Sequence, residues 1–267
     1  LSVISGGPGT GKTTALTKLL ALLCADAMDR GESMPIIELA APTGKAAQRM
    51  AESIRTVAAQ IPQEKIATHL AALMPKTLHR LLGLNGISPK PARNQDSPIE
   101  ADVVVVDEAS MMDITIFSRL VDALPANARL VLLGDRFQLA SIEAGCVMAD
   151  VCDAFAPNTF AADFVTVVNK VIKSPKNHIG KSKGPRSFSP VVELQYSYRF
   201  QEGEAIGVVS RAINSGSAGN TISTLSMKHS GQSTCMLVPH PGDAEMLSLV
   251  HEGFKPLLDA KDPSDAL

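Results

Sequence analysis

Residues 1–20 read LSVISGGPGTGKTTALTKLL, and this stretch decides the fold class. Its apolar start, Leu1–Ser5, is typical of a short buried strand, and the leucine spacing over Thr13–Cys24 indicates an amphipathic helix. Between them lies Gly6-Gly-Pro-Gly-Thr-Gly-Lys-Thr13, a glycine-rich loop of the form G-x-x-x-x-G-K-[ST]. A strand, this loop and a helix in that order predict a phosphate-binding loop in an α/β domain.

Each part of the loop has a physical purpose. Glycines let the backbone curl so that successive N–H groups face phosphate oxygens, and the helix N-terminus adds partial positive charge. Lys12 is expected to reach the β- and γ-phosphates of ATP, and the Thr13 hydroxyl to ligate Mg²⁺. The alternative is a glycine-rich turn without a ligand. The residues expected to bind the nucleotide are Gly6, Gly7, Pro8, Gly9, Thr10, Gly11, Lys12, Thr13 and Thr14.

Short apolar strands and amphipathic helices alternate along the following residues. Strands are expected over Ile36–Ala41, Asp102–Val106 and Arg129–Leu133, and helices over Gly44–Ala59 and Asp113–Leu124, with short helical segments at 62–75 and 77–82. The unbroken valine run at 103–106 is typical of a central strand that is buried on both faces. This order predicts a three-layer fold with a parallel sheet and right-handed crossovers.

The valine run ends in two carboxylates, Asp107 and Glu108. A strand of a parallel sheet that ends in an acid delivers it to the edge where the phosphate-binding loop lies. Asp107 is therefore expected to hold Mg²⁺, and Glu108 to accept a proton from the attacking water. Taken alone, the pair would only start a loop.

Gln138 follows the next strand, in LGDRFQL (133–139). An uncharged donor and acceptor at that edge could contact both the γ-phosphate and the water. The alternative is a turn whose geometry Gly134 and Asp135 supply.

Composition narrows the class of protein. Of 267 residues, 45% are hydrophobic and 19% charged, which excludes wholesale disorder. A formal net charge of −2 excludes a global basic field, so a nucleic-acid surface would have to be local. The four cysteines form no C-x-x-C pair, so neither a zinc site nor a disulfide framework is expected, and a reduced cytoplasmic setting is. No apolar run reaches the roughly 18 residues of a membrane helix.

Two stretches interrupt the strand–helix pattern. Residues 86–100 are polar and carry three prolines, which predicts a loop or small hairpin. Residues 164–192 hold six basic residues and no acidic one, which is typical of a linker that is either solvated or in contact with DNA backbone. We expect a first domain over 1–155 with an inserted pin at 83–101, a basic linker over 156–190, and an incomplete second α/β domain over 191–267. Without an initiator Met, the chain is expected to be part of a longer protein.

The order of motifs resembles superfamily 1 DNA helicases, and within them the RecD-like family of exodeoxyribonuclease V alpha subunits. The resemblance extends to about residue 215 and rests on GGPGTGKTT (6–14), LAAPTGKAAQRM (39–50), KTLHRLLG (76–83), VVVVDEASMMD (103–113), LLGDRFQLASIEAG (132–145) and YSYRF (196–200). It implies a RecA-like P-loop NTPase domain and the start of a second RecA-like domain.

The resemblance also implies roles for residues whose type alone is ambiguous. Arg199 lies where the family carries an arginine finger from its second motor domain; the alternative is a surface ion pair. Thr43 and Lys45 resemble a motif that grips single-stranded DNA, and Thr77 and His79 a second one. The alternative for both threonines is helix capping, and His79 could simply be a cap or a packed residue.

The function implied is ATP-dependent movement along single-stranded DNA, 5′ to 3′, in recombinational repair of double-strand breaks, with RecB- and RecC-like partner subunits. Other readings stay open: a stand-alone RecD-like helicase, another P-loop ATPase such as a small-molecule kinase, or a non-hydrolysing assembly subunit. Stimulation of ATP turnover by single-stranded DNA separates the helicases from the other P-loop ATPases and from a non-hydrolysing subunit.

Overall fold

The computed structural model describes residues 1–84, 91–138, 147–171, 180–181, 189–199, 205–214, 216–226 and 244–259. The chain divides into two compact units, residues 1–199 and residues 200–267. The first unit contains the sheet and every site residue predicted from the sequence. The described part of the second consists of helices α8 (Ala205–Asn214), α9 (Ala218–Ser226) and α10 (Ala244–Asp259). Within the described part of the chain, no helix is both long and apolar enough to span a membrane.

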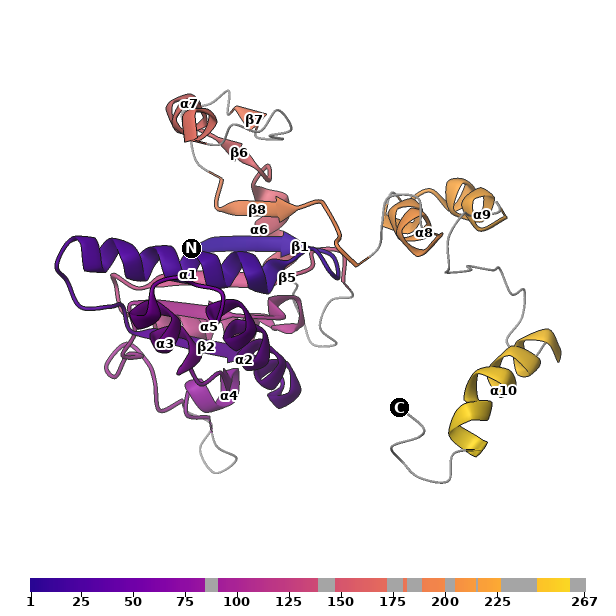
Figure 1. Cartoon of the computed structure of the whole chain (residues 1–267), viewed down its shortest axis with the longest axis horizontal. Helices are drawn as coiled ribbons and strands as arrows, with labels where there is room; N and C mark the ends of the chain where they lie inside the picture. Colours follow the sequence, from indigo (N-terminus) through magenta and orange to yellow (C-terminus); the bar gives the residue numbers. More distant parts are fainter. Residues whose placement is uncertain are drawn as a thin grey trace. The chain divides into compact units, whose positions relative to one another are not determined.

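A six-stranded parallel sheet forms the centre of the first unit, in the order β3-β2-β4-β5-β1-β8 (Figure 1). Its strands are β1 (Ser2–Gly6), β2 (Ile37–Ala41), β3 (Lys76–Thr77), β4 (Val103–Val106), β5 (Arg129–Gly134) and β8 (Val191–Leu194). All four valines of β4 are fully buried, as a strand covered on both faces requires. The predicted α/β fold with a parallel sheet is confirmed.

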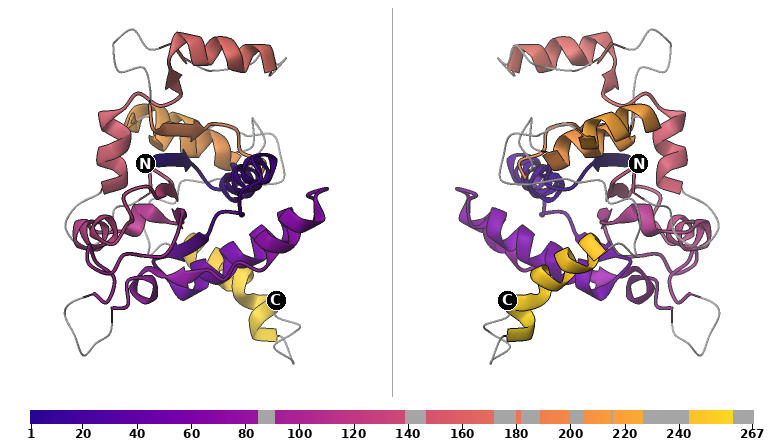
Figure 2. Two further views of the ribbon diagram at one scale, coloured as in Figure 1. Left: turned by 90° about the vertical axis from the view of Figure 1, so that its left-hand side faces the viewer. Right: turned by 90° about the vertical axis from the view of Figure 1, so that its right-hand side faces the viewer.

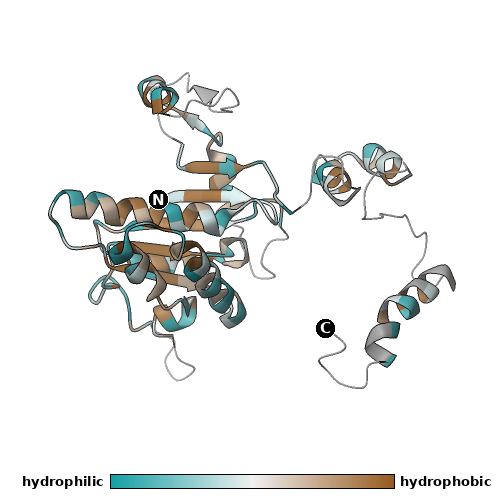
Figure 3. Cartoon of the chain, viewed as in Figure 1, coloured by the Kyte–Doolittle hydropathy of each residue, from teal (hydrophilic) through white to brown (hydrophobic). Residues whose placement is uncertain are grey.

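Helices cover both faces of this sheet. One face carries α1 (Lys12–Asp29), α2 (Gly44–Ala58) and α3 (Glu64–Ala71), and the other α4 (Leu78–Leu81), α5 (Ile114–Asp122) and α6 (Val147–Ala154). Figure 2 shows α1 in indigo and α2 in purple on one side of the sheet, and α5 in magenta and α6 in salmon on the other. Successive residues of each strand face opposite sides of the sheet. Val103 and Val105 belong to the cluster that contains α1 and α2, and Val104 and Val106 to the cluster that contains α5. The central strands are correspondingly apolar (Figure 3).

The edge strand β8 differs from the sequence expectation. Residues 191–195 were expected to open a second domain, yet β8 pairs in parallel with β1, with Val3 opposite Val191. Val191 is fully buried, and the division between the two units falls after Arg199. The physical reason is that β1, itself buried, needs a partner on the edge that β5 leaves open. The basic stretch therefore interrupts the first unit rather than ending it.

Part of the expected linker has regular structure. Residues 162–171 form helix α7 (Ala162–Val171), and strand β6 (Thr159–Phe160) pairs with β7 (Gly180–Lys181). The basic residues Lys173, Lys176, Lys183 and Arg186 lie outside the described residues. In the expected pin, Asn94 and Ser97 form an antiparallel bridge, while 85–90 lie outside the described residues.

Candidate nucleotide-binding site

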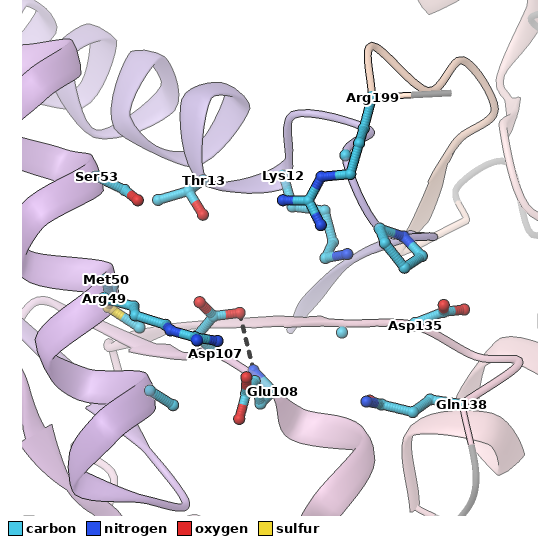
Figure 4. Close-up of a pocket in the computed structure, with 14 residues that line it drawn as sticks. Lys12, Thr13, Arg49, Met50, Ser53, Asp107, Glu108, Asp135, Gln138 and Arg199 are labelled. Carbon is cyan, nitrogen blue, oxygen red and sulfur yellow. Dashed lines mark hydrogen bonds between the residues drawn. The ribbon is translucent and has the colours of Figure 1, made fainter. Parts of the chain in front are cut away.

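A cavity of about 290 Å³ opens beside the phosphate-binding loop, where the central strands end (Figure 4). Its walls come from the loop, from α2, from the residues that follow β4 and β5, and from the segment after β8. Five predicted site residues that are far apart in the sequence line it together: Lys12, Asp107, Glu108, Gln138 and Arg199. A parallel sheet accounts for this convergence, because all its strands end at the same edge.

The loop between β1 and α1 has the backbone of an anion cradle. Gly9 and Gly11 have φ angles of 75° and 84°, in the left-handed region that side chains disfavour. Gly11 is also the residue that caps α1, and it supplies no side-chain hydrogen bond. The N–H groups of the first turn of α1 are therefore free of a side-chain cap, as a phosphate ligand requires. The Thr10 hydroxyl braces the loop by donating to the Gly7 carbonyl oxygen over 2.9 Å.

Lys12 bends back over its own loop. Its Nζ donates to the carbonyl oxygens of Gly6 and Gly7, at 2.5 and 3.2 Å. Burial lowers the pKa of Lys12, and the carboxylates of Asp135, Asp107 and Glu108 oppose this shift. The ammonium is therefore partly desolvated and close to the cradle, where a phosphate oxygen could replace the two carbonyls as acceptor.

The two carboxylates after β4 differ in their surroundings. Burial raises the pKa of Asp107, and the Glu108 N–H, which donates to Asp107 Oδ1 over 2.8 Å, and the charge of Lys12 partly offset this shift. Glu108 has a φ of 52°, which costs a non-glycine residue roughly 1–2 kcal/mol. Its left-handed backbone and the start of a 3₁₀ turn at Ala109 place both carboxylates at the cavity (Figure 4).

The donor set suits Mg²⁺. The Thr13 hydroxyl and the Asp107 carboxylate both line the cavity, and both are hard oxygen ligands of the kind that Mg²⁺ prefers. Asp107 is a partly buried carboxylate with a raised pKa, so a cation beside it would relieve the cost of burying its charge.

Gln138 is held by a residue that the sequence did not single out. Its Oε1 accepts a hydrogen bond of 2.5 Å from the hydroxyl of Ser110, which is buried just beyond Glu108. With the oxygen occupied in this way, the amide nitrogen points into the cavity (Figure 4). The predicted turn is present as well, since the Gln138 N–H donates to the Asp135 carbonyl oxygen over 3.1 Å.

Arg199 reaches the cavity from the segment that follows β8. This segment is tied to the loop: Ser197 Oγ donates to the Pro8 carbonyl oxygen over 3.0 Å, and the Tyr198 N–H to the Gly9 carbonyl oxygen over 2.8 Å. The expectation that this arginine comes from a second domain differs from the structure, in which Arg199 belongs to the first unit. The pairing of β8 with β1 is the cause, because it delivers the next residues directly over the loop.

The four residues expected to grip DNA lie on two neighbouring junctions of the sheet. Thr43 and Thr77 follow or end the adjacent strands β2 and β3, and each caps a helix by accepting a backbone hydrogen bond, from the N–H of Ala46 and of Arg80. Helix capping, the alternative prediction for both threonines, is therefore present. Lys45 and His79 are exposed, and each is the second residue of its helix, α2 and α4 respectively.

Some lining residues escaped prediction. Arg49 and Ser53 project from α2, and Asp135 follows β5. Arg49 lies within the quoted motif LAAPTGKAAQRM, and its spacing of three residues from buried Ala46 is the signal that could have placed it on the inner face of α2. Thr14, in contrast, is exposed on α1 and does not line the cavity.

Comparison with known proteins finds one matching family model and several relatives. The family model described as an AAA domain matches residues 1–144. The RecBCD enzyme subunit RecD of Mycobacterium tuberculosis is 37% identical over 250 residues, which are 94% of this chain and 37% of that protein. The RecD subunit of Haemophilus influenzae is 36% identical over 239 residues, 83% of this chain and 34% of that protein. The chain thus spans little more than a third of these relatives.

More distant matches include the ATP-dependent RecD2 DNA helicase of Deinococcus radiodurans, 36% identical over 156 residues, 58% of this chain and 18% of that protein. Among solved structures, Bacteroides Pif1 bound to single-stranded DNA has 21% identity and a TM-score of 0.42 over 93% of this chain and 52% of its own. The family model covers more than half of the chain, from the phosphate-binding loop through the carboxylate pair to Gln138. The chain therefore belongs to the AAA-domain family, and over most of its length it is similar to RecD subunits.

Proposed function

We propose that this chain is the ATP-hydrolysing part of a DNA helicase or translocase that moves along single-stranded DNA. One observation carries the proposal: Lys12, Asp107, Glu108, Gln138 and Arg199 line a single cavity beside an uncapped helix N-terminus. These are the groups that binding and hydrolysis of a nucleoside triphosphate require. They also come from separate segments, whose meeting depends on the whole sheet.

Each residue has a role in phosphoryl transfer. The loop amides and Lys12 bind phosphate oxygens, and Arg199 stabilises the charge that develops on the transferred group. Thr13 and Asp107 would hold Mg²⁺, which supplies neutralisation of the phosphate charge. Glu108 accepts the proton of the attacking water, and Gln138, oriented by Ser110, donates its amide N–H to the γ-phosphate or the water.

Single-stranded DNA is the second ligand in this proposal. β2 and β3 are neighbours, with Ala41 opposite Thr77, so the segments that follow them lie side by side. Lys45 and His79 are exposed there, where they can contact backbone phosphates together with the hydroxyls of Thr43 and Thr77. Both threonine oxygens already accept a backbone N–H, and each hydroxyl keeps its hydrogen for a phosphate.

The finer parts of the proposal rest on the family. The relatives are named RecBCD enzyme subunit RecD, which supports RecB- and RecC-like partner subunits for this chain. The family resemblance implies recombinational repair of double-strand breaks and 5′-to-3′ movement, and the cysteine pattern agrees with a reduced, cytoplasmic setting. The RecD2 relative keeps the alternative of a stand-alone RecD-like helicase open.

The test is ATP turnover by the chain with and without an oligo(dT) strand. We expect turnover that requires Mg²⁺ and that rises when the strand is added. In Lys12→Ala we expect no turnover, with or without the strand. A small-molecule kinase would also lose turnover in Lys12→Ala but would not respond to DNA. Turnover that is unaffected by single strands in the intact chain, while the same strands fail to bind, would reject the DNA part of the proposal.

A further inference from the structure

Arg49 lines the cavity and takes none of the phosphoryl-transfer roles of the other lining residues. Helix α2 turns Ala46, Arg49, Met50 and Ser53 toward the cavity, a spacing of three, four and seven residues that defines one helix face. Ala46 and Met50 are 5% and 1% exposed, so this face is packed firmly against the core. The root of the Arg49 side chain is therefore held in position, while its guanidinium is exposed to the cavity.

Within the described part of the chain, the Arg49 guanidinium has no protein acceptor. Across the described residues, it forms no ion pair, although Asp107 and Glu108 line the same cavity. The nearest acid on its own helix, Glu52, accepts instead from Gln48 over 3.1 Å. An arginine presents five N–H donors in a planar fork that matches phosphate oxygens, so this cation is available to an anionic ligand.

The position of Arg49 selects one end of that ligand. Figure 4 shows its side chain extending from α2 into the cavity on the side of Asp107 and Glu108. The loop and the N-terminus of α1 form the other side, where the inner phosphates of a nucleotide would sit. The charges of the cavity lining balance one another only when Arg49 is included. With Arg49, the cavity holds three cations, the others being Lys12 and Arg199, against the carboxylates of Asp107, Glu108 and Asp135.

We propose that Arg49 is a phosphate-binding residue that contacts the γ-phosphate of ATP and not the phosphates that ADP retains. This inference rests on the proposed nucleotide-binding function and deepens it. It has a structural consequence, because α2 begins directly after Thr43, six residues before Arg49, or roughly 9 Å along the helix axis. One rigid helix then contacts the γ-phosphate near its second turn and the DNA backbone at its start, which links the nucleotide state to the grip on the strand.

The experiment measures binding of fluorescent ADP and of a fluorescent, non-hydrolysable ATP analogue to the whole chain and to Arg49→Gln. We expect the affinity for the ATP analogue to fall roughly tenfold or more, as for other lost hydrogen bonds to a charged group, with ADP affinity changed less than twofold. Arg49→Lys should recover part of the loss, because it keeps the charge but not the fork. Arg55→Gln, an exposed site on the same helix, is the control and should match the wild type.

The outcomes separate the possible failures. An unchanged ratio of ATP-analogue to ADP affinity in Arg49→Gln overturns the proposal, and so does an equal loss of both ligands with a lowered melting temperature, which would mark a structural role. Lys12→Ala is measured in parallel. If it abolishes binding while Arg49→Gln is silent, the nucleotide site stands and only the role of Arg49 falls. If the wild-type chain binds neither nucleotide, the proposed function itself fails, and this inference with it.

Discussion

Two junctions of the same sheet, β1–α1 and β2–α2, connect a buried strand to a helix at the same edge, yet they end differently. At β1–α1 the capping residue is Gly11, with a left-handed φ of 84° and no side-chain hydrogen bond. At β2–α2 the capping residue is Thr43, in extended conformation, and its hydroxyl oxygen accepts from the Ala46 N–H over 3.2 Å. The second junction satisfies one of its free amides internally, and the first does not.

Under the proposed function, this difference gives one architecture two kinds of phosphate contact. An uncapped helix that follows a glycine-rich loop leaves several N–H groups free for one ligand. A bound triphosphate needs several such donors. A threonine-capped helix needs no ligand for the amide that the cap satisfies, and here it exposes a single charged donor, Lys45. In the proposed function this donor contacts a DNA backbone that slides past it. The following variants test whether the two junctions are specialised in this way.

The largest effects should appear at the first junction and its carboxylate partner. Glu108→Gln keeps the shape of the side chain but removes the base, so turnover should fall by roughly 10²–10⁴ while ATP binding persists. Lys12→Ala should lose both, because Lys12 contacts the phosphates themselves. Steady-state turnover and equilibrium binding of nucleotide to both variants measure this, and wild-type turnover in Glu108→Gln would contradict the mechanism.

Alanine substitutions at glycines of the two junctions should have clearly different effects on stability. Gly9 has a φ of 75°, and a Cβ there would collide with the Cβ of Arg199, so Gly9→Ala should cost roughly 1–2 kcal/mol or more and weaken ATP binding. Gly44 begins α2 and has open space around it, so Gly44→Ala should be neutral or stabilise by about 0.4–1 kcal/mol. Urea unfolding of the two variants gives both values, and equal effects would show that the loop has no special backbone requirement.

Removal of the threonine cap should have a smaller effect. Thr43→Ala leaves the Ala46 N–H without its acceptor and should destabilise the chain by about 1 kcal/mol, whereas Thr43→Ser should retain most of the stability. Chemical denaturation measures the difference. If Thr43→Ala matches the wild type, the cap contributes nothing, and the contrast between the junctions is one of sequence alone.

The smallest effect concerns the charge that the second junction exposes. Lys45→Gln should reduce the slope of single-strand affinity against salt by about 0.7, the value for one lost phosphate contact, uniformly across sequences. Lys65→Gln, an exposed lysine of α3, is the matched control. Titrations of labelled oligo(dT) at several salt concentrations measure both slopes. The same slope in Lys45→Gln and in the wild type would exclude Lys45 from the DNA contact.

Most of the core of the first unit could be predicted from short-range pattern. The phosphate-binding loop, the valine strand and its two carboxylates, and the amphipathic helices depend on residue type and spacing within about twenty positions. Physical constraints at that range are strong: glycine for a left-handed φ, unbroken apolar side chains for a strand covered on both faces, and a period of 3.6 for a helix. The family resemblance added Arg199 and the two threonine segments, which residue type alone would not have singled out.

The sequence by itself therefore determined the parallel α/β architecture and identified the side chains and amides that are able to bind phosphate. Only the tertiary structure decided that β8 closes the edge of β1, that Arg199 consequently reaches the cavity from within the first unit, and that Arg49 faces the same cavity. Strand pairing across roughly 190 residues depends on which buried edge is left without a partner, and this is a property of the assembled sheet. Local spacing carries no information about it, because hydrogen bonds between strands join residues that are neighbours only after the chain has folded.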